Sequence, residues 1–197
     1  MGVPKHLLRV NGESVAVAVI GRIEHIFSEI LVVGKPVPSL GLTARFVPDS
    51  CAQDSPLVGI LSGLRAARSE WSIALACDMP LIRPQLVESI AACLAPSCDA
   101  VVPVVGGHHE PLLAAYRRSA IPAIEAAIAA RRLSIQRLLR TLRVLELPES
   151  DLVKCDPRLE SFSNLNTPKD LGAMLIPSSG SRSVCAPIGR KTFGSPT

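Results

Sequence analysis

The sequence predicts a three-layer α/β fold in one domain, with a mostly parallel, doubly wound sheet between two layers of helices. Short apolar segments alternate with helical segments of about a dozen residues, which is the pattern of such folds. The chain has 197 residues, 48% hydrophobic and 19% charged, enough for a substantial core. The apolar run from Trp71 to Ala76 has no alternation, as expected of a strand buried on both faces.

The helices are indicated by apolar residues at helical spacing. Leu57, Ile60 and Leu64 fall on one face of a helix. Pro84 suits the first turn of another helix, and Thr167-Pro168-Lys169-Asp170 has the capping threonine, proline and acid of a helix start. The pattern predicts helices over 15–27, 57–68, 84–94, 120–130 and 134–142.

The strands are indicated by short apolar runs that end at turn residues. Ile30 to Val33 is closed by Gly34-Lys35-Pro36, and Ala44 to Val47 is followed by a polar loop, Pro48 to Ser55. Gly106-Gly107 is expected to form a turn. We expect strands at 30–33, 44–47, 71–76, 99–105, 112–116 and 143–147. In a sheet of this kind, ligands bind beyond the carboxyl ends of the strands.

Composition and charge argue against a nucleic-acid partner. Aromatic residues make up only 3%, too few for a surface of stacking rings. The formal net charge is +4, but residues 177–197 hold Arg182, Arg190 and Lys191 and no acid. This segment is also rich in serine, glycine and proline, which is typical of disorder. We therefore expect one domain over 1–176 and a disordered basic tail over 177–197.

The sequence also predicts a cytoplasmic protein without membrane contact. No stretch reaches the roughly 18 apolar residues of a membrane span, and the first residues, MGVPKHLLRV, lack the apolar stretch of a signal peptide. The six cysteines form neither a C-x-x-C pair nor a zinc-ligand spacing. Reduced, partly buried thiols are the interpretation that fits a cytosolic protein.

Asp78 is the strongest candidate for chemistry. It follows a predicted buried strand at the rim where ligands bind, and Pro80 keeps this turn out of a helix. A carboxylate there suits Mg²⁺, which binds one or two protein oxygens together with phosphate oxygens and water. Asp49 ends the preceding strand in the same way and could share a metal or bind a ribose hydroxyl. A turn-forming aspartate is the alternative for both positions.

Other polar side chains are weaker candidates. Lys5 lies in a short Gly/Pro segment before a helix, where an ammonium group can neutralise phosphate, although most lysines are simply solvated. His108 and His109 are adjacent on an extended segment and point in opposite directions, so a solvated turn is favoured over a metal site. Ser62 lies inside an amphipathic helix and not at a strand-to-helix turn, which argues against a nucleophilic serine.

The order of these residues resembles that of the molybdenum cofactor guanylyltransferase family, within the nucleotidyltransferase superfamily. The resemblance extends from residue 1 to about residue 175. The matching segments are Met1-Gly2-x-x-Lys5, Val47-Pro48-Asp49, Pro56-Leu57-x-Gly59-Ile60, Ala76-Cys77-Asp78-Met79-Pro80, Glu110-Pro111-Leu112-x-Ala114-x-Tyr116-Arg117-Arg118 and Asn164-x-Asn166-Thr167-Pro168-x-Asp170-Leu171.

The resemblance implies a nucleotide-diphospho-sugar transferase-like fold that transfers GMP from GTP to molybdopterin carrying molybdenum and releases pyrophosphate. It implies Mg²⁺ as cofactor, with molybdoenzymes or their chaperones as further partners. By position, Lys5 would be a catalytic contact to the triphosphate, Asp49 would bind GTP, and Asp78 would be catalytic and hold Mg²⁺. Asn164 and Asn166 match a late asparagine motif near the nucleotide or pterin.

Three alternatives remain open: a cytidylyltransferase acting on the same pterin, a sugar-nucleotide transferase and a non-catalytic nucleotide-binding paralogue. Asn164-x-Asn166 resembles the guanylyl branch, because the cytidylyl branch tends to show acids, and the chain is short for a sugar-nucleotide transferase. Two departures affect the nucleotide contacts. Gly34-Lys35 stand where the family often has an asparagine, and the loop 50–55 lacks the family's second aspartate, for which Asp54 is the candidate substitute.

Members of the family begin with a strand and a Gly-rich loop, L-A-G-G-x-S-x-R-M-G, whereas this chain begins at the Met-Gly of that motif. Losing a central strand would cost far more than the roughly 5–15 kcal/mol of a domain's stability. We therefore expect Met1 to be an internal methionine, with the start roughly 15–25 residues upstream. The in-frame codons before Met1 test this. A nearby stop codon without an L-A-G-G-like segment contradicts it.

Overall fold

The computed structural model describes residues 9–10, 13–34, 44–50 and 55–163. All of them belong to the first of two compact units, Met1–Asn166 and Thr167–Thr197. No helix among these described residues is both long and apolar enough to cross a membrane.

Most of the described strands run in one direction. The short strands β1 (Arg9–Val10) and β2 (Glu13–Ser14) form an antiparallel pair, and β3 (Leu31–Val33) pairs in parallel with β4 (Arg45–Val47). In the larger sheet the order is β5-β8-β6-β9, where β8 runs against both of its neighbours. Its strands are β5 (Trp71–Leu75), β6 (Ala100–Val105), β7 (His108–His109), β8 (Leu113–Arg117) and β9 (Val144–Leu147).

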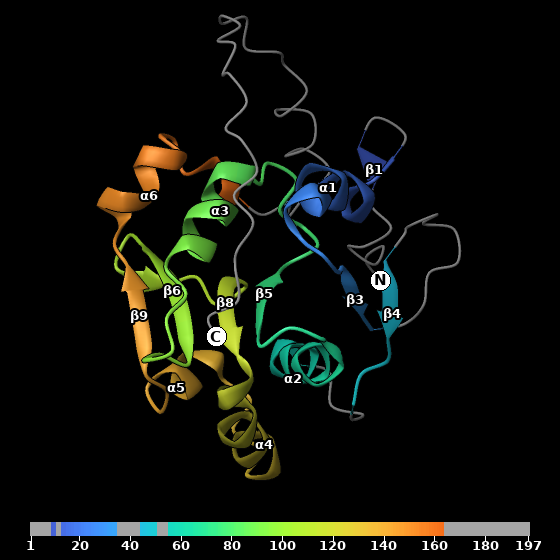
Figure 1. Ribbon diagram of the computed structural model, residues 1–197, viewed down its shortest axis with the longest axis vertical. Coiled ribbons are helices and arrows are strands. Elements are labelled where there is room, and N and C mark those ends of the chain that lie inside the picture. The colour runs from blue at the N-terminus through green and yellow to red at the C-terminus, as the bar shows by residue number, and fades with distance from the viewer. Residues whose placement is uncertain (1–8, 11–12, 35–43, 51–54, 164–197) are drawn as a thin grey trace, which may run out of the picture. The chain divides into compact units, whose positions relative to one another are not determined.

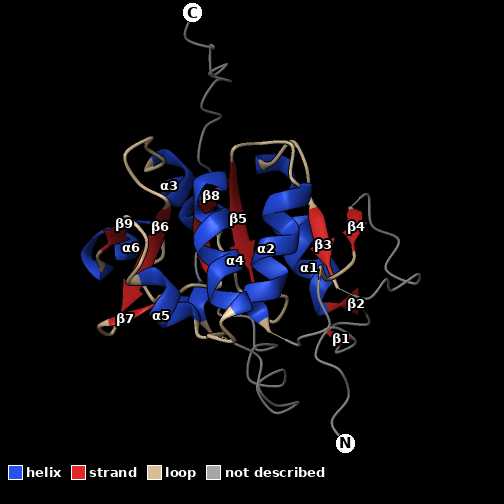
Figure 2. Cartoon of the chain, turned by 90° about the horizontal axis from the view of Figure 1, so that it is seen from below, coloured by secondary structure: helices blue, strands red, loops and turns tan. Residues whose placement is uncertain are grey.

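Helices cover both faces of these strands, as Figure 1 and Figure 2 show. On one face α2 packs against α4 and α4 against α5, while on the other α1 packs against α3 and α3 against α6. The predicted three-layer α/β fold is therefore confirmed. The helices are α1 (Val15–Ile23), α2 (Pro56–Ala66), α3 (Pro84–Ala92), α4 (Ile121–Ala129), α5 (Ile135–Leu139) and α6 (Glu149–Cys155), with 3-10 turns η2 (Glu24–Ile26), η4 (Arg118–Ala120) and η5 (Glu160–Phe162).

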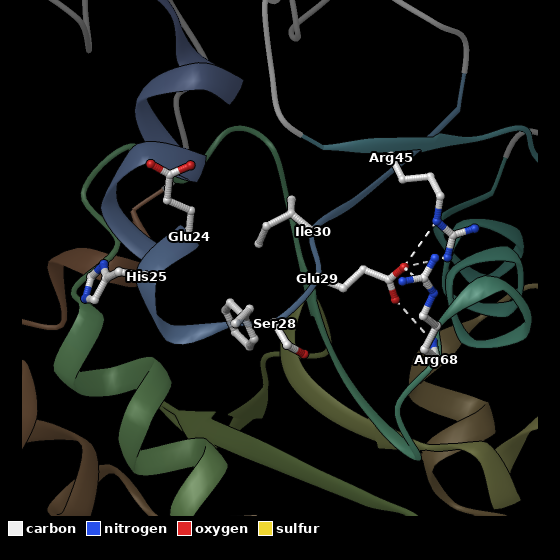
Figure 3. A pocket seen from close by; sticks show the side chains of 8 residues that line it. Glu24, His25, Ser28, Glu29, Ile30, Arg45 and Arg68 are labelled. Carbon is white, nitrogen blue, oxygen red and sulfur yellow. Dashed lines mark hydrogen bonds and ion pairs between the residues drawn. The ribbon is translucent and has the colours of Figure 1, made fainter. Parts of the chain in front are cut away.

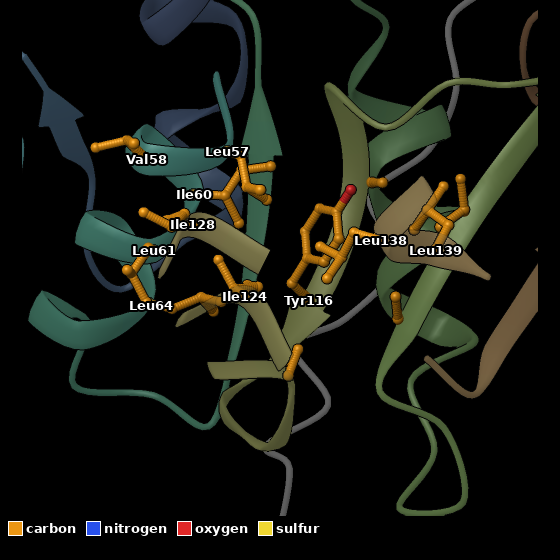
Figure 4. Close-up of a cluster of buried hydrophobic side chains, with 14 residues drawn as sticks. Leu57, Val58, Ile60, Leu61, Leu64, Tyr116, Ile124, Ile128, Leu138 and Leu139 are labelled. Atoms are coloured by element: carbon orange, nitrogen blue, oxygen red, sulfur yellow. The ribbon is translucent and has the colours of Figure 1, made fainter. Parts of the chain in front are cut away.

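Helix α2 is the centre of the main hydrophobic core. Ser55 caps it by accepting a hydrogen bond from the Leu57 N–H (3.3 Å), and Pro56 occupies its first turn. Its buried face meets Tyr116 of β8 and Ile124 of α4 (Figure 4). Each large aliphatic side chain fully buried here contributes about 1.5–3 kcal/mol. The buried residues of α2 are Leu57, Val58, Ile60, Leu61, Ser62 and Leu64.

A cluster of ion pairs around Glu29 brings the beginnings of three strands together. Glu29 precedes β3 and accepts hydrogen bonds from Arg45 Nη2, at the start of β4 (2.7 Å), and from the Arg68 N–H, just before β5 (3.2 Å). Arg45 also donates to the Ala66 carbonyl at the end of α2 (2.6 Å). The hydrogen bond from Arg45 lowers the pKa of Glu29. Strands β3, β4 and β5 therefore start at one edge, which we call the start edge.

A second cluster, around Asp99, lies at the same edge of the larger sheet. Asp99 precedes β6 and accepts hydrogen bonds from the Arg143 guanidinium before β9 (Nη2 2.8 Å, Nε 3.0 Å) and from the Ser119 hydroxyl after β8 (2.6 Å). Arg117, at the end of β8, donates to Glu70, which precedes β5 (Nε to Oε1, 2.8 Å). The opposite edge, where β3, β4, β5, β6 and β9 end, is called the end edge.

The expectation that the strand at 71–76 is buried on both faces is wrong. Every residue of β5 is half-buried, as is every residue of β3. Among the described strands, β5 pairs only with β8, and β3 pairs only with β4. Each strand thus has one lateral side without a described neighbour. The apolar run of β5 reflects the helices on the two faces of the sheet, but among the described residues its side chains are only half-buried.

The other differences from the expected elements are small. Helix α2 ends at Ala66, two residues before the expected end. Helix α6 was not expected, because its polar sequence ESDLVKC lacks an apolar period; Glu149 and Asp151 in its first turn favour the helix electrostatically. The turn at Gly106-Gly107 is confirmed, and φ values of +55° and +79° explain why glycine suits both positions. The helix start expected at Thr167 lies outside the described residues.

Replacing Asp99 by asparagine should destabilise the protein by about 1–2 kcal/mol, because the charge that holds Arg143 is lost. The value stays modest because the Arg143 side chain is 62% exposed. Equilibrium urea unfolding measures this difference. Asp151→Asn breaks an exposed pair with Lys154 and removes one of two first-turn charges of α6, and should change stability by less than about 1 kcal/mol.

The effect of Asp99 should depend on pH. Its hydrogen bonds from Arg143 lower its pKa far below the usual range. The unfolded chain therefore binds this proton more readily than the folded one, so the stabilisation is complete above a pH of about 4 and is lost below it. Unfolding of the wild type and the Asp99→Asn variant should converge as the pH falls from about 4 to about 2. A constant difference across that range contradicts this assignment.

Candidate functional site

The end edge carries the candidate site. In sheets of this kind ligands bind beyond the carboxyl ends of the parallel strands, and Asp49 and Asp78 follow β4 and β5 there. Their strands begin together at the Glu29 cluster, so both side chains emerge at the same edge. Lys5, Asn164, Asn166 and Asp54 lie outside the described residues, so their predicted roles stay predictions.

Helix α2 fixes the backbone next to Asp49. The Ser50 N–H donates a hydrogen bond to Ser62 Oγ (2.8 Å), and the buried Ser62 hydroxyl donates to the Val58 carbonyl (2.8 Å). Ser62 is thus a helical residue with a structural role, as expected. Asp49 itself is exposed, and its carboxylate makes no hydrogen bond or ion pair with another described residue. A ligand at the end edge can reach it.

The turn that carries Asp78 is fixed where it leaves the sheet. The Ala76 N–H donates to the Leu112 carbonyl (2.9 Å), which extends the β5–β8 ladder to the residue before Cys77. Beyond Asp78, Met79 is 2% exposed and Ile82 is fully buried. Asp78 is half-buried and lies between the hydrogen-bonded Ala76 and the buried Met79. Its carboxylate is therefore presented by a rigid backbone.

Arg83 anchors the other end of this turn. Its N–H donates to Ser161 Oγ (3.0 Å), and its guanidinium contacts Glu160 (Nη2 to Oε2, 2.7 Å) and the fully buried Asp156 (Nε to Oδ1, 3.1 Å). The contact with Asp156 is an ion pair by distance only, since Oδ1 accepts no hydrogen bond. The hydrogen bond to Glu160 raises the pKa of Arg83. No local sequence pattern indicates this cluster, because its members are about 75 residues apart.

Glu110 is a third carboxylate at this edge, and the sequence analysis assigned it no role. The β5–β8 ladder pairs Leu75 with Leu113, and Asp78 and Glu110 lie the same number of residues beyond that pair. The Glu110 side chain is half-buried, and burial raises its pKa. Its position in the sequence, shortly before the predicted strand at 112–116, was the feature that could have marked Glu110 as a candidate site residue.

The histidines beside this edge differ from each other. His108 is exposed, as expected of a solvated turn. His109 is half-buried, and its Nε2 lies 2.8 Å from Glu146 Oε1 on β9. The expected solvated turn is therefore right for His108 and wrong for His109, because β7 folds back on β6 and places His109 near β9.

A cavity of about 570 Å³ lies next to the Glu29 cluster (Figure 3). Its lining includes Glu29, Arg45 and Arg68, which mark the start edge. The cavity is thus at the opposite edge from Asp49 and Asp78. Glu24 and Glu29 in the lining balance the formal charge of the two arginines, and Glu29 pairs with both, which leaves little positive charge there for an anionic ligand. We do not assign the candidate site to this cavity.

Known proteins resemble the chain in sequence over most of its length. Residues 1–147 match the sequence model of the MobA-like NTP transferase domain. A probable molybdenum cofactor guanylyltransferase of Natranaerobius thermophilus is 32% identical over 87% of this chain and 86% of its own length. A molybdenum cofactor guanylyltransferase of Desulfosudis oleivorans is 33% identical over 72% of this chain and 70% of its own.

Solved structures agree with these sequence matches. The molybdopterin-guanine dinucleotide biosynthesis protein A of Archaeoglobus fulgidus has a TM-score of 0.74 and 29% identity, and the match covers 87% of this chain and 89% of that one. The 2-C-methyl-D-erythritol 4-phosphate cytidylyltransferase of Thermus thermophilus has a TM-score of 0.60 at 16% identity, over 86% and 91% of the two chains, and supports the fold alone. Since the family model matches about three quarters of the sequence, the chain belongs to the MobA-like NTP transferase family.

Proposed function

We propose that this nucleotidyltransferase transfers GMP from GTP to molybdopterin carrying molybdenum and releases pyrophosphate. The observation that carries the proposal is the 32% identity, over 87% of the chain, to a relative named as a molybdenum cofactor guanylyltransferase. The end edge supports it, because two carboxylates stand there on fixed backbone, beyond the ends of β4 and β5. Nucleotidyl transfer needs aligned substrates and cations that offset phosphate charge.

Nucleotidyltransferases generally use a divalent metal, and the residues at the end edge fit Mg²⁺. Asp78 offers hard carboxylate oxygens on a turn anchored at Ala76 and Arg83, and Mg²⁺ binds one or two carboxylates together with phosphate oxygens. Asp78 would hold the ion. When bound, Mg²⁺ would offset the negative charge on the phosphate oxygens of GTP.

The remaining roles are those that the resemblance to the guanylyltransferase family implies. Asp49 would bind the nucleotide on the β4 side of Asp78, and Lys5 would neutralise the triphosphate as a point cation. In the reaction, a terminal phosphate oxygen of the pterin attacks the α-phosphorus of GTP. The new O–P bond forms as the bond to the β-phosphate oxygen breaks, and pyrophosphate leaves with that electron pair. Asn164 and Asn166 would lie near the bound substrates.

We also propose the setting in which this reaction takes place. The enzyme acts in the cytoplasm and passes its product to molybdoenzymes or their chaperones. Its catalytic domain comprises residues 1–176, and residues 177–197 form a separate basic tail. GTP rather than CTP is the donor, because Asn164-x-Asn166 matches the guanylyl branch of the family.

Asp78→Asn should abolish Mg²⁺-dependent release of pyrophosphate from GTP and molybdopterin, because the amide lacks the charge that holds the metal. The assay measures pyrophosphate, with CTP in a parallel reaction to test the cytidylyl alternative. Asp151→Asn, on α6, serves as the control and should keep wild-type turnover. Unchanged turnover in Asp78→Asn refutes the assignment of this residue, and release with CTP alone refutes the choice of GTP.

Ser62→Ala should raise KM for GTP several-fold with little change in kcat, because the segment after Asp49 loses its hydrogen bond to α2. The loss corresponds to about 1 kcal/mol, or roughly fivefold. Hydrogen exchange at the Ser50 amide should accelerate by a similar factor, which checks the structural cause separately. Faster exchange at the Ser50 amide with an unchanged KM for GTP would show that Asp49 does not contribute to GTP binding.

A further inference from the structure

Glu110 occupies a distinctive position on the end edge. Figure 1 shows the strands in the order β4, β3, β5, β8. Asp49 follows β4, Asp78 follows β5 and Glu110 precedes β8, so the three carboxylates come in the same order along the edge. The Ala76 N–H to Leu112 carbonyl bond (2.9 Å) joins the segments that carry Asp78 and Glu110. Glu110 therefore stands beside Asp78, on the side away from Asp49.

The backbone around Glu110 is firmly held. Its N–H donates to the Pro103 carbonyl (2.9 Å), and its own carbonyl accepts from the Leu113 N–H (3.2 Å). The fully buried Tyr116 donates its hydroxyl hydrogen to the Pro111 carbonyl (2.9 Å), which fixes the next residue. A carboxylate on such a backbone is positioned before any ligand arrives, so it loses little entropy on binding.

The Glu110 carboxylate is half-buried and makes no hydrogen bond or salt bridge with another residue of the described part of the chain. Burial raises the pKa of Glu110, and the charge of the nearby, exposed His108 offsets this effect only in part. By contrast, Glu146 and Glu149 on the same edge are engaged by His109 and by the Gly106 N–H, both at 2.8 Å. Partial burial without a partner is costly for a carboxylate, and N–H donors on a ligand would offset that cost.

We propose that Glu110 binds the 2-amino-4-oxo ring edge of a substrate, accepting hydrogen bonds from the ring N–H and the neighbouring amino group. This inference rests on the proposed function, whose two substrates, GTP and molybdopterin, both carry that edge. Two adjacent N–H donors match the two oxygens of one carboxylate. The phosphate groups of the substrates cannot bind to Glu110 in this way, because their negative charge repels that of the carboxylate.

The order of residues along the edge favours the pterin as the source of this ring. A nucleotide bound between Asp49 and Asp78 fills the β4 side and leaves the β8 side to the acceptor. Glu110 lies on that β8 side, and Asp78 lies between the two halves, where the reacting phosphates meet. Glu110 is therefore a specificity-determining residue for the acceptor rather than a participant in the bond exchange.

A binding measurement tests the ring chemistry without any turnover. Fluorescence titrations compare pterin with lumazine, the same bicycle with a carbonyl in place of the 2-amino group. The wild type should bind pterin at least tenfold more tightly than lumazine, and Glu110→Gln and Glu110→Ala should lose this preference. Glu88→Gln, an exposed glutamate on α3, should retain it. No pterin binding by the wild type, or a preference that survives Glu110→Ala, overturns the proposal.

Kinetics then distinguish the two sources of the ring. If the pterin is bound, Glu110→Gln should raise KM for molybdopterin at least tenfold and leave KM for GTP within twofold. If guanine is bound instead, the variant should lose the preference for GTP over ITP, which lacks the 2-amino group. Unchanged values for both substrates overturn the proposal. A wild type that releases no pyrophosphate refutes the proposed function, while the ring titration still decides the role of Glu110.

Discussion

The packing of α2 against both sheets is the constraint on which the candidate site depends. This helix contacts β3, β4 and β5 and, through its buried face, the core residues of β8 and α4. No described strand pairing joins β3 to β5. Contacts with α2 therefore hold the β3–β4 pair next to β5 in place of backbone hydrogen bonds between strands. Its Ser62 also holds the backbone after Asp49. One amphipathic helix thus sets both the fold and the place of a candidate ligand contact.

Both edges of the sheet carry charges that are paired within the protein, and the end edge also carries two carboxylates without a described ion-pair partner. At the start edge, Glu29, Asp99 and Glu70 each pair with arginines, and these pairs align the beginnings of the strands. At the end edge, the Asp49 and Glu110 carboxylates have no ion-pair partner among the described residues. Charges that are satisfied within the protein stabilise the fold, whereas unsatisfied ones are available to ligands. The contrast supports placing the chemistry at the end edge.

Much of the fold was predictable from the sequence, because local patterns determine it. Apolar spacing in 57–68 located α2, and short apolar runs located β3, β4, β6 and β9. Burial of β5 was not predictable, since an apolar run reports the faces that helices cover and not the number of neighbouring strands. Helix α6 was missed because charge at its first turn, not an apolar stripe, favours it.

The candidate site was predictable only in part, because local sequence patterns do not report contacts between distant parts of the chain. Asp49 and Asp78 follow recognisable strands, so their common edge could be inferred from chain order. The Arg83 cluster could not, because its partners lie far along the chain and meet only in the folded protein. Glu110 was visible as part of a motif, but its partial burial, without a salt bridge to another described residue, is a property of tertiary structure.

Strands β3 and β5 each have one lateral side without a strand neighbour in the described part of the chain, and this affects the stiffness of that part. Ladders resist sliding because their hydrogen bonds are directional, whereas apolar contacts with a helix tolerate small displacements more readily. The β3–β4 pair is therefore the more compliant part, restrained by α2 and by the exposed ion pairs of Glu29. Since dissolved ions weaken such pairs, a high ionic strength should loosen this restraint and let the segments that carry Asp49 and Asp78 shift relative to each other.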